Sequence, residues 1–229
     1  MKTQRNDALF VRNERLGLFA NLGGMALLVA AVFVLFNAPG GLGLYFVFLV
    51  AGMLLVQAGL TFGRLGRRTD LALDKALKSL DDSYQLFHHT GPVQHLLTGP
   101  SGVWILIPRH TKGEVHFDKA RQKWENRGGN LLKRLWRWLT DERLGRPHYE
   151  AMIEAGRLDQ FLRDKWTSKE DVPVNAVAVF LNNETLVQAG TAPFPAVNLK
   201  RLSKTVSRNQ PDQSFSKASL NRLNKILSE

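Results

Sequence analysis

Two uncharged apolar stretches near the N-terminus constrain the fold of this 229-residue chain more than any other feature. They run from Leu16 to Phe36 and from Gly41 to Phe62, and their only strongly polar residues are Asn21 and Gln57. Each is roughly 20 residues long, the length at which an α-helix crosses the hydrocarbon core of a bilayer. A signal peptide has a shorter apolar region and is not followed by a second span. The pattern therefore predicts a two-helix transmembrane hairpin over residues 16–62, in contact with membrane lipid.

Basic residues flank the two stretches, whereas the turn between them carries no charge. Met1–Arg15 is polar and net basic, and Arg64, Arg67 and Arg68 follow the second stretch. By the positive-inside rule, this distribution predicts that both termini and the soluble domain lie in the cytoplasm. We expect an integral protein of a prokaryotic cytoplasmic membrane, with a cytoplasmic N-terminal segment before the hairpin and a basic juxtamembrane linker at residues 63–69.

The remaining composition excludes some kinds of site and leaves others open. The chain has no cysteine, which excludes disulfides and thiolate metal ligands. Its formal net charge of +11 favours contact with an anionic surface. Both nucleic acid and lipid headgroups meet that description, and the net charge does not choose between them.

Residues 70–206 show the alternating periodicities of an α/β domain, with a mixed sheet flanked by helices. Helical spacing of apolar residues predicts helices over Asp70–Asp82, Pro147–Lys165 and 197–206. Apolar and β-branched runs predict strands at 84–90, 93–97, 103–109, 114–117, 123–126, 174–181 and 185–188. Residues 207–229 are expected to form a linker and a C-terminal helix.

The stretch Val93–Gly113 has a strand-turn-strand pattern at its centre, where two apolar runs flank a Gly-Pro-Ser-Gly turn. It resembles the core of the nuclease-related domain (NERD) family, a branch of the restriction-endonuclease-like fold. That family's pattern is Asp-His, a few apolar residues, Gly-Pro-x-Gly-Val, and a strand ending in Glu-x-Lys before a Lys-Gly turn. The matching residues are His95, Gly99, Pro100, Gly102, Val103, Lys112 and Gly113. The resemblance covers residues 70–205 and implies a restriction-endonuclease-like sheet.

The three positions that carry the chemistry in that family are changed in this chain. Where the resemblance expects Asp, Glu and Lys, the residues are Gln94, Ile107 and Arg109. Nucleases of this fold hold Mg²⁺ with carboxylates, and the ion both activates water and offsets phosphate charge. Ile107 cannot bind a metal, and Gln94 offers only a neutral oxygen. We expect no catalytic residues, metal or cofactor here, with Arg109 and Lys112 as candidate contacts to phosphate or nucleic acid.

Relocated carboxylates would restore a nuclease, so an active Mg²⁺-dependent enzyme is the alternative. The acids available for such a site are Asp70, Asp74, Glu114 and Glu150. Asp70 falls where the resemblance expects the Glu of the opening helix, and Glu150 where it expects a Gln. This alternative requires two or more carboxylates to converge within about 5 Å beside Arg109, because a divalent ion needs such a cluster.

A segment between residues 127 and 146 combines Trp and Leu on one helical face with cations on the other. Its candidate contact residues are Lys133, Arg134, Trp136, Arg137 and Trp138. Such a helix suits a membrane interface. It also suits nucleic acid, with cations on phosphates and Trp as a stacking surface. An ordinary core-packing helix with a solvated basic face is the third interpretation, and the sequence leaves all three open.

The six histidines form no metal-binding motif in the sequence. His88 and His89 are neighbours on a predicted strand, so their side chains are expected on opposite faces, where they cannot share a metal directly. The spacing leaves open whether His95 meets Asp70 or Asp118 in the fold. The resulting hypothesis is a membrane-anchored NERD-like pseudoenzyme that binds nucleic acid or serves as a membrane-surface or protein-interaction scaffold. The sequence indicates neither a protein partner nor an oligomeric state.

Overall fold

The computed structural model describes residues 1–38, 40–60, 66–127, 144–168, 170–190, 192–208 and 215–228. The chain divides into two compact units, one formed by Met1–Arg5 with Ala72–Glu229 and the other by Asn6–Leu71. The division falls inside helix α3 (Gly66–Leu77), which runs unbroken across it. In the order of the chain, the smaller unit is therefore an insertion after the first strand of the larger one.

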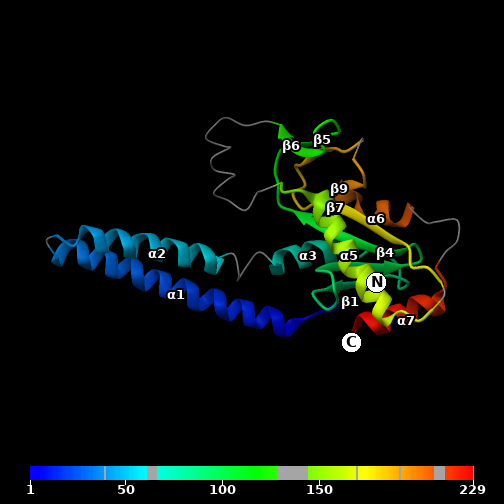
Figure 1. Cartoon of the computed structure of the whole chain (residues 1–229), viewed down its shortest axis with the longest axis horizontal. Helices are drawn as coiled ribbons and strands as arrows, with labels where there is room; N and C mark the ends of the chain where they lie inside the picture. Colours follow the sequence, from blue (N-terminus) through cyan, green and yellow to red (C-terminus); the bar gives the residue numbers. More distant parts are fainter. Residues whose placement is uncertain are drawn as a thin grey trace. The chain divides into compact units, whose positions relative to one another are not determined.

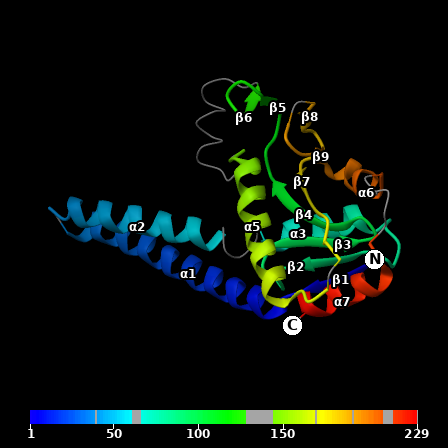
Figure 2. The same cartoon turned by 45° about the vertical axis from the view of Figure 1, so that its right-hand side comes forward.

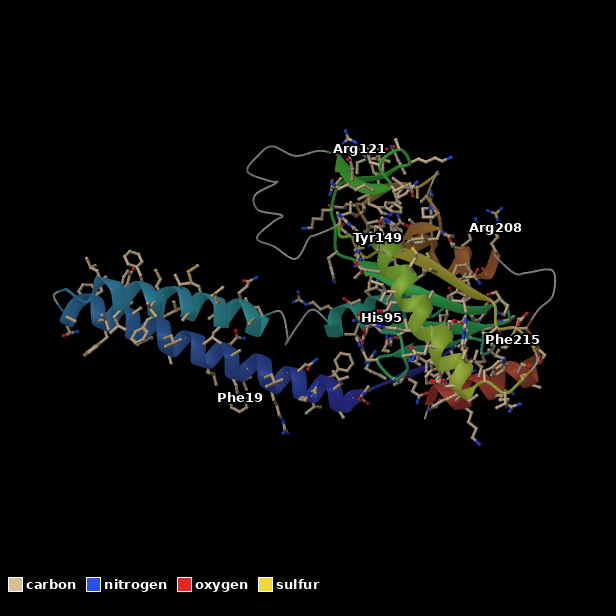
Figure 3. The ribbon with its side chains drawn as sticks, viewed as in Figure 1. Phe19, His95, Arg121, Tyr149, Arg208 and Phe215 are labelled. Atoms are coloured by element: carbon tan, nitrogen blue, oxygen red, sulfur yellow. The ribbon has the colours of Figure 1, made fainter. Side chains whose placement is uncertain are left out.

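The smaller unit is built on two apolar helices, α1 (Asp7–Asn37) and α2 (Leu42–Leu60). Both are long and apolar enough to cross a membrane, by length and composition, and only 11% of the apolar window of each is buried. Phe19 is among the large side chains that project outward from α1 (Figure 3). At 1.5 Å per residue, α1 is about 46 Å long. This length exceeds the hydrocarbon core of a bilayer, which is about 30 Å thick.

Small residues line the contact between α1 and α2. Gly17, Gly24 and Ala31 are buried on α1, and Gly52 and Gly59 are buried on α2. A Cβ added at Gly24 would lie 2.8 Å from the Gly52 carbonyl oxygen, and one at Gly59 would lie 2.7 Å from the Gly17 carbonyl oxygen. The two backbones approach closely because these positions have no side chain. The glycines thus pack the hairpin against itself.

The larger unit contains a six-stranded mixed sheet in the order β1-β2-β3-β4-β7-β9 (Figures 1 and 2). Its strands are β1 (Lys2–Arg5), β2 (Gln85–His88), β3 (His95–Gly99), β4 (Gly102–Arg109), β7 (Val174–Phe180) and β9 (Ala196–Asn198). β3 is antiparallel to both of its neighbours, whereas the pairs β1–β2, β4–β7 and β7–β9 are parallel. The mixed sheet predicted from the sequence is confirmed.

A smaller three-stranded sheet follows β4 in the chain. Its order is β6 (Lys123–Arg127), β5 (Glu114–Asp118) and β8 (Leu186–Gln188), with an antiparallel β5–β6 hairpin and a parallel β5–β8 pair. Phe117 and Trp124 of this hairpin share a buried cluster with Phe180 at the end of β7. The small sheet therefore packs against the main sheet at the carboxyl end of β7.

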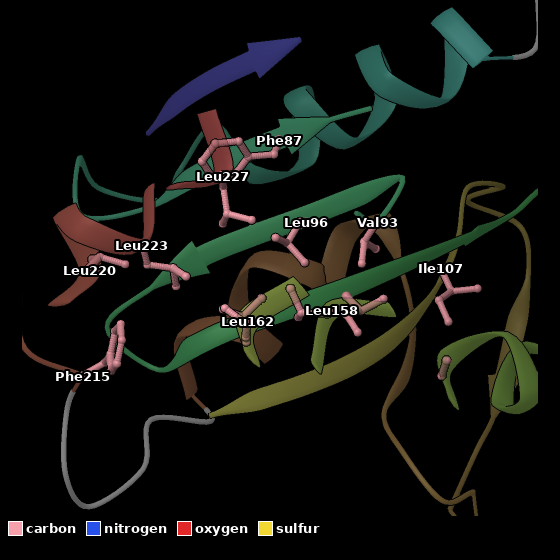
Figure 4. Packing of buried hydrophobic residues seen from close by; sticks show 13 residues of the cluster. Phe87, Val93, Leu96, Ile107, Leu158, Leu162, Phe215, Leu220, Leu223 and Leu227 are labelled. Carbon is pink, nitrogen blue, oxygen red and sulfur yellow. The ribbon is translucent and has the colours of Figure 1, made fainter. Parts of the chain in front are cut away.

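Helices cover both faces of the main sheet. On one face, α3 and α6 (Leu199–Arg208) pack on Leu86, Leu97, Trp104 and Leu106. On the other face, α5 (Pro147–Lys165) and α7 (Lys217–Ser228) pack on a cluster that Figure 4 shows at close range. Its strand residues are Phe87, Leu96, Val103, Ile105 and Ile107. Successive residues of β4 alternate between the two clusters, as expected of a central strand covered on both faces.

The structure corrects the prediction for the N-terminal segment and part of the prediction for the buried side of α5. Strand β1 lies within the polar segment expected before the hairpin, and it pairs residue by residue with β2, with Lys2 opposite Gln85 and Arg5 opposite His88. In α5, apolar spacing predicts that Met152 and Ile153 face the core, but they are 68% and 56% exposed. Leu158 and Leu162, predicted on the same side, are buried, and Ala151 is buried with them.

Replacing Gly102 by alanine is expected to destabilise the larger unit by roughly 2–4 kcal/mol. Gly102 has φ +91°, and an added Cβ would lie 2.3 Å from the Pro173 carbonyl oxygen. Urea unfolding followed by circular dichroism measures the effect. Gly156→Ala is the matched control, because that helical glycine has open space around it and alanine is the better helix former. A destabilisation by Gly156→Ala as large as that by Gly102→Ala would contradict the explanation.

Candidate functional site: a histidine and carboxylate cluster

A pair of histidines stands at the loop end of the β2–β3 hairpin. His88 is the last residue of β2 and His95 the first of β3, and they are register partners in the antiparallel pair. Directly opposed residues project from the same face of a sheet. Leu86 and Leu97 lie on that face too, two residues along each strand, and pack against α3. The hairpin therefore directs both imidazoles toward the helix.

A chain of polar contacts runs through these rings. Nδ1 of His88 lies 3.0 Å from Nδ1 of His95, and Nε2 of His88 lies 3.0 Å from Oδ1 of Asp74 on α3. Arg5 Nη2 donates to Oδ2 of the same carboxylate at 2.6 Å, and Thr3 Oγ1 donates to its Oδ1 at 3.4 Å. A carboxylate accepts only, so Nε2 of His88 carries hydrogen. When the His88 ring is neutral, its Nδ1 is an acceptor and His95 Nδ1 donates.

A second carboxylate belongs to the cluster. Asp70 lies one helical turn before Asp74 on the unbroken α3, and residues four apart project from the same face of a helix. Asp70, His88 and His95 each offer a ligand atom, and these three atoms all lie within 4.8 Å of one another. Asp70 and His88 are fully buried and His95 is 4% exposed. Within the part of the chain that the structure describes, this is the group with metal-binding geometry.

The environment of the cluster fixes its charges. Burial, together with the charges of His88 and His89, lowers the pKa of His95 to about 3. Burial raises the pKa of Asp74, but the hydrogen bond and charge of His88 and the charge of Arg5 lower it further, and the net shift is downward. The pKa of His89 is lowered by burial and by the charge of His88. At neutral pH the cluster thus holds an ionised Asp74 beside a neutral His95.

The stability of the metal-free larger unit is expected to fall as the pH decreases below about 6.5. Unfolded His95 takes up a proton near 6.5, whereas the folded ring stays neutral to about 3. The unfolded state therefore binds more protons in this window, at a cost of up to about 1.4 kcal/mol per pH unit. Asp74 acts in the same direction, because its stabilisation is lost as pH falls through its lowered folded pKa.

Urea midpoints measured in EDTA between about pH 7 and pH 4 check this dependence. The titratable and charged groups that face His95 are His88, His89 and Asp70, and those that face Asp74 are His88 and Arg5. His95→Gln is expected to flatten the profile, since the variant removes the ring whose protonation favours unfolding. A midpoint that does not change with pH in the unmodified protein would contradict the expectation.

The three positions changed from the family pattern have different surroundings. Gln94 is exposed, and its backbone carbonyl accepts the His89 N–H at 2.8 Å. Ile107 is 4% exposed and belongs to the cluster beneath α5. Arg109 forms an ion pair with Glu150 of α5 and donates to the Pro108 carbonyl oxygen at 3.1 Å. Ile107 is thus a core residue, and the guanidinium of Arg109 already has an acidic partner.

The relocated acids do not converge beside Arg109. Asp70 and Asp74 belong to α3, whereas Glu150 belongs to α5, on the opposite face of the sheet. The carboxylate of Glu114 accepts from Gln188 within the small sheet, at 2.7 Å. A sheet therefore separates the acids of α3 from Arg109, and the proposed Mg²⁺ site at Arg109 is not formed by this set.

Lys112 and Asp118, two further residues singled out from the sequence, lie outside the histidine and carboxylate cluster. The side chain of Lys112 is exposed, and its backbone carbonyl accepts from Asn126 at 2.7 Å. Asp118 accepts from the backbone N–H groups of Ala120 and Arg121, in the β5–β6 turn. The candidate contact residues Lys133, Arg134, Trp136, Arg137 and Trp138 lie outside the described residues.

The sequence interpretation missed the pairing of His88 with His95. The sequence predicts a strand that continues past His88, with the side chains of His88 and His89 on opposite faces. β2 ends at His88, and His89 has φ +55°, with its ring edge-on to His95 at 5.0 Å between centroids. The register of the predicted hairpin was the available signal, because it fixes which residues stand opposite each other.

Comparisons with models of protein families, with curated proteins and with solved structures gave no match.

Proposed function

We propose that this protein is a membrane-anchored, NERD-like pseudoenzyme that binds nucleic acid at the cytoplasmic face of the membrane without hydrolysing it. The order of elements supports the resemblance on which the proposal rests. An opening helix, α3, is followed by β3 and β4 around the Gly-Pro-Ser-Gly turn, then by helix α5 and by β7, which ends at Phe180. The resemblance expects that succession, including the apolar strand ending in Phe, and it carries the restriction-endonuclease-like part of the proposal.

The observation that carries the proposal is the surroundings of the three changed positions. Ile107 is packed in the core, where a carboxylate would be buried without water, and Arg109 is paired with Glu150. Hydrolysis of phosphodiesters in this fold relies on a carboxylate-bound metal at those positions. Without it, the domain retains a phosphate-binding charge distribution and no means of activating water there.

Helix α6 supplies an exposed basic surface. Its sequence contains no acidic residue, its Leu202 and Val206 are buried against the sheet, and its exposed cations are Lys200, Arg201, Lys204 and Arg208. Arg208 projects from the end of this helix in Figure 3. A row of cations without acids favours a polyanion whose phosphates recur along a backbone. We place nucleic acid there, with α1 and α2 as the membrane anchor.

The test uses the full-length protein in nanodiscs of zwitterionic lipid, because β1 precedes the hairpin in the chain and truncation would remove it. Labelled DNA and RNA are titrated at several salt concentrations, with and without Mg²⁺. The expected result is binding whose logarithm falls linearly with log salt, and no cleavage. Cleavage would overturn the pseudoenzyme proposal, and absence of binding would favour the interaction scaffold.

Matched charge variants locate the nucleic-acid surface. Changing Lys200, Arg201 and Lys204 to Gln should weaken binding and reduce the salt slope by about 0.9 for each phosphate that the variant no longer neutralises. Changing three exposed cations of α5, Arg157, Arg163 and Lys165, to Gln is the control, because it removes the same net charge. An equal weakening in the control would show that net charge, and not α6, is responsible.

A further inference from the structure

We propose that Asp70, His88 and His95 bind a divalent transition-metal ion of the Zn²⁺ class. The sequence interpretation expects no metal, and the proposed nucleic-acid binding does not require one, so the inference goes beyond both. It rests on the arrangement of two imidazoles and one carboxylate that α3, β2 and β3 bring together in a buried place.

The spacing of the nitrogens is that of two ligands on one ion. Imidazole nitrogens lie about 2.0–2.1 Å from Zn²⁺, so two of them in tetrahedral geometry are about 3.3 Å apart. Nδ1 of His88 and Nδ1 of His95 are 3.0 Å apart, within a few tenths of an ångström of that separation. A bound ion would replace the hydrogen bond between these two nitrogens and contact both of them. The His95 ring stays neutral, because its proton moves from Nδ1 to Nε2.

Asp74 acts as a positioning residue in this site. Its carboxylate accepts from Nε2 of His88 at 3.0 Å, which leaves His88 Nδ1 as the atom available to an ion. A carboxylate on the far nitrogen of a ligating histidine orients the ring and raises its basicity. Arg5 and Thr3 of β1 hold that carboxylate in turn. The cluster thus has both the ligands and the supporting contacts of a metal site.

The ligand types select the class of ion. Two nitrogens and one carboxylate, without a thiolate, suit Zn²⁺ and its first-row neighbours. Mg²⁺ and Ca²⁺ prefer sets made of oxygen alone. Three protein ligands leave a fourth position for water, as in zinc sites that act on substrates. The inferred ion therefore differs from the Mg²⁺ that the family resemblance implies, and it lies on the α3 face of the sheet, opposite Ile107 and Arg109.

The site connects β1 and α3, the two segments that precede and follow the α1–α2 helices in the sequence. Arg5 ends β1 immediately before the smaller unit begins, and Asp70 and Asp74 lie on the helix that follows α2. A bound ion would tie α3 to the β2–β3 hairpin, and Asp74 would pass that restraint to β1. Because an ion that binds only the folded state stabilises it, occupancy should raise the unfolding midpoint of the larger unit.

The experiment titrates the full-length protein, purified in detergent without a histidine tag, with Zn²⁺ against a chromophoric zinc indicator. The expected result is one ion per chain and a higher unfolding temperature. Co²⁺ replaces Zn²⁺ in a parallel titration, because its visible d–d bands report a low-coordinate nitrogen and oxygen ligand set in the unmodified protein. Absence of stoichiometric binding by the wild type would overturn the proposal, even if every variant misfolded.

Single substitutions test which residues bind the ion. His88→Gln and His95→Gln are each expected to weaken Zn²⁺ binding by more than about 100-fold, because each removes a ligand. Asp74→Asn should weaken it by roughly 10–100-fold while the Co²⁺ bands remain, and Asp74→Glu should restore part of the affinity. His116→Gln in the small sheet is the matched control and should not change Zn²⁺ binding.

Undiminished binding in the His88→Gln/His95→Gln double variant would place the ion elsewhere and overturn the inference. Nucleic-acid binding is measured separately, so the two proposals can fail independently.

Discussion

Replacing Trp104 by alanine is expected to destabilise the larger unit by about 3–5 kcal/mol, the typical cost of truncating a large buried aromatic side chain. Trp104 lies on the central strand β4, is fully buried and packs in the cluster beneath α3 and α6. Its indole Nε1 donates to Ser101 Oγ at 2.9 Å. The substitution would remove the ring from the middle of the sheet and leave Ser101 without that donor. Urea unfolding followed by circular dichroism at 222 nm, the peptide-bond signal, measures the decrease in stability.

Two comparisons separate packing from the hydrogen bond. Trp104→Phe keeps a ring in place and removes the indole N–H, so it should cost less than alanine, with about 1–3 kcal/mol attributable to the unsatisfied Ser101. Met152→Ala is the surface control, because Met152 is exposed and surface changes usually alter stability by less than about 0.5 kcal/mol. Equal destabilisation by Trp104→Ala and Met152→Ala would show that the core does not lie where the structure has it.

The elements of the main sheet that could be predicted are those whose sequences are predominantly apolar. β4 and β7 are continuous apolar runs, and the Gly-Pro-Ser-Gly turn marks the β3–β4 hairpin. β1 could not be predicted, because Lys-Thr-Gln-Arg has no apolar residue and joins the sheet through backbone pairing and polar side-chain contacts. In α5, helical spacing allows two adjacent stripes, and only the tertiary packing decides that Leu158 is buried and Met152 exposed.

The candidate site could not be predicted from the sequence for a related reason. The sequence singles out Asp70, Asp74 and His95, but it predicts that His88 lies in a strand that continues through His89. The cluster depends on β2 ending at His88 and on the register that sets His88 opposite His95. It also depends on which face of the sheet α3 covers, which local sequence does not specify. Similarly, the ion pair of Arg109 with Glu150 follows from the packing of α5.

Joining Met1–Arg5 to α3 through a short Gly/Ser linker, in place of the hairpin, is expected to release the protein from membranes as a folded, soluble unit. The larger unit contains β1 and is compact by itself, and the apolar helices belong to the smaller unit. The Arg5 guanidinium contacts Asp74 on α3, so a linker of about ten residues, reaching up to about 33 Å, spans the gap. The measurement is the protein's distribution between membrane and soluble fractions, followed by its unfolding midpoint.

A chain that simply starts at Asp70 is the informative comparison. It lacks β1, so β2 becomes an unprotected edge and Asp74 is left without Arg5 and Thr3. We expect it to be less stable than the linked chain by roughly 2–4 kcal/mol, because several backbone hydrogen bonds and a charge-assisted one are missing, and to aggregate more readily. Its Zn²⁺ affinity should fall as well, because Asp74 would no longer be held against His88. Equal stability and equal affinity in the two chains would mean that β1 contributes to neither the sheet nor the site.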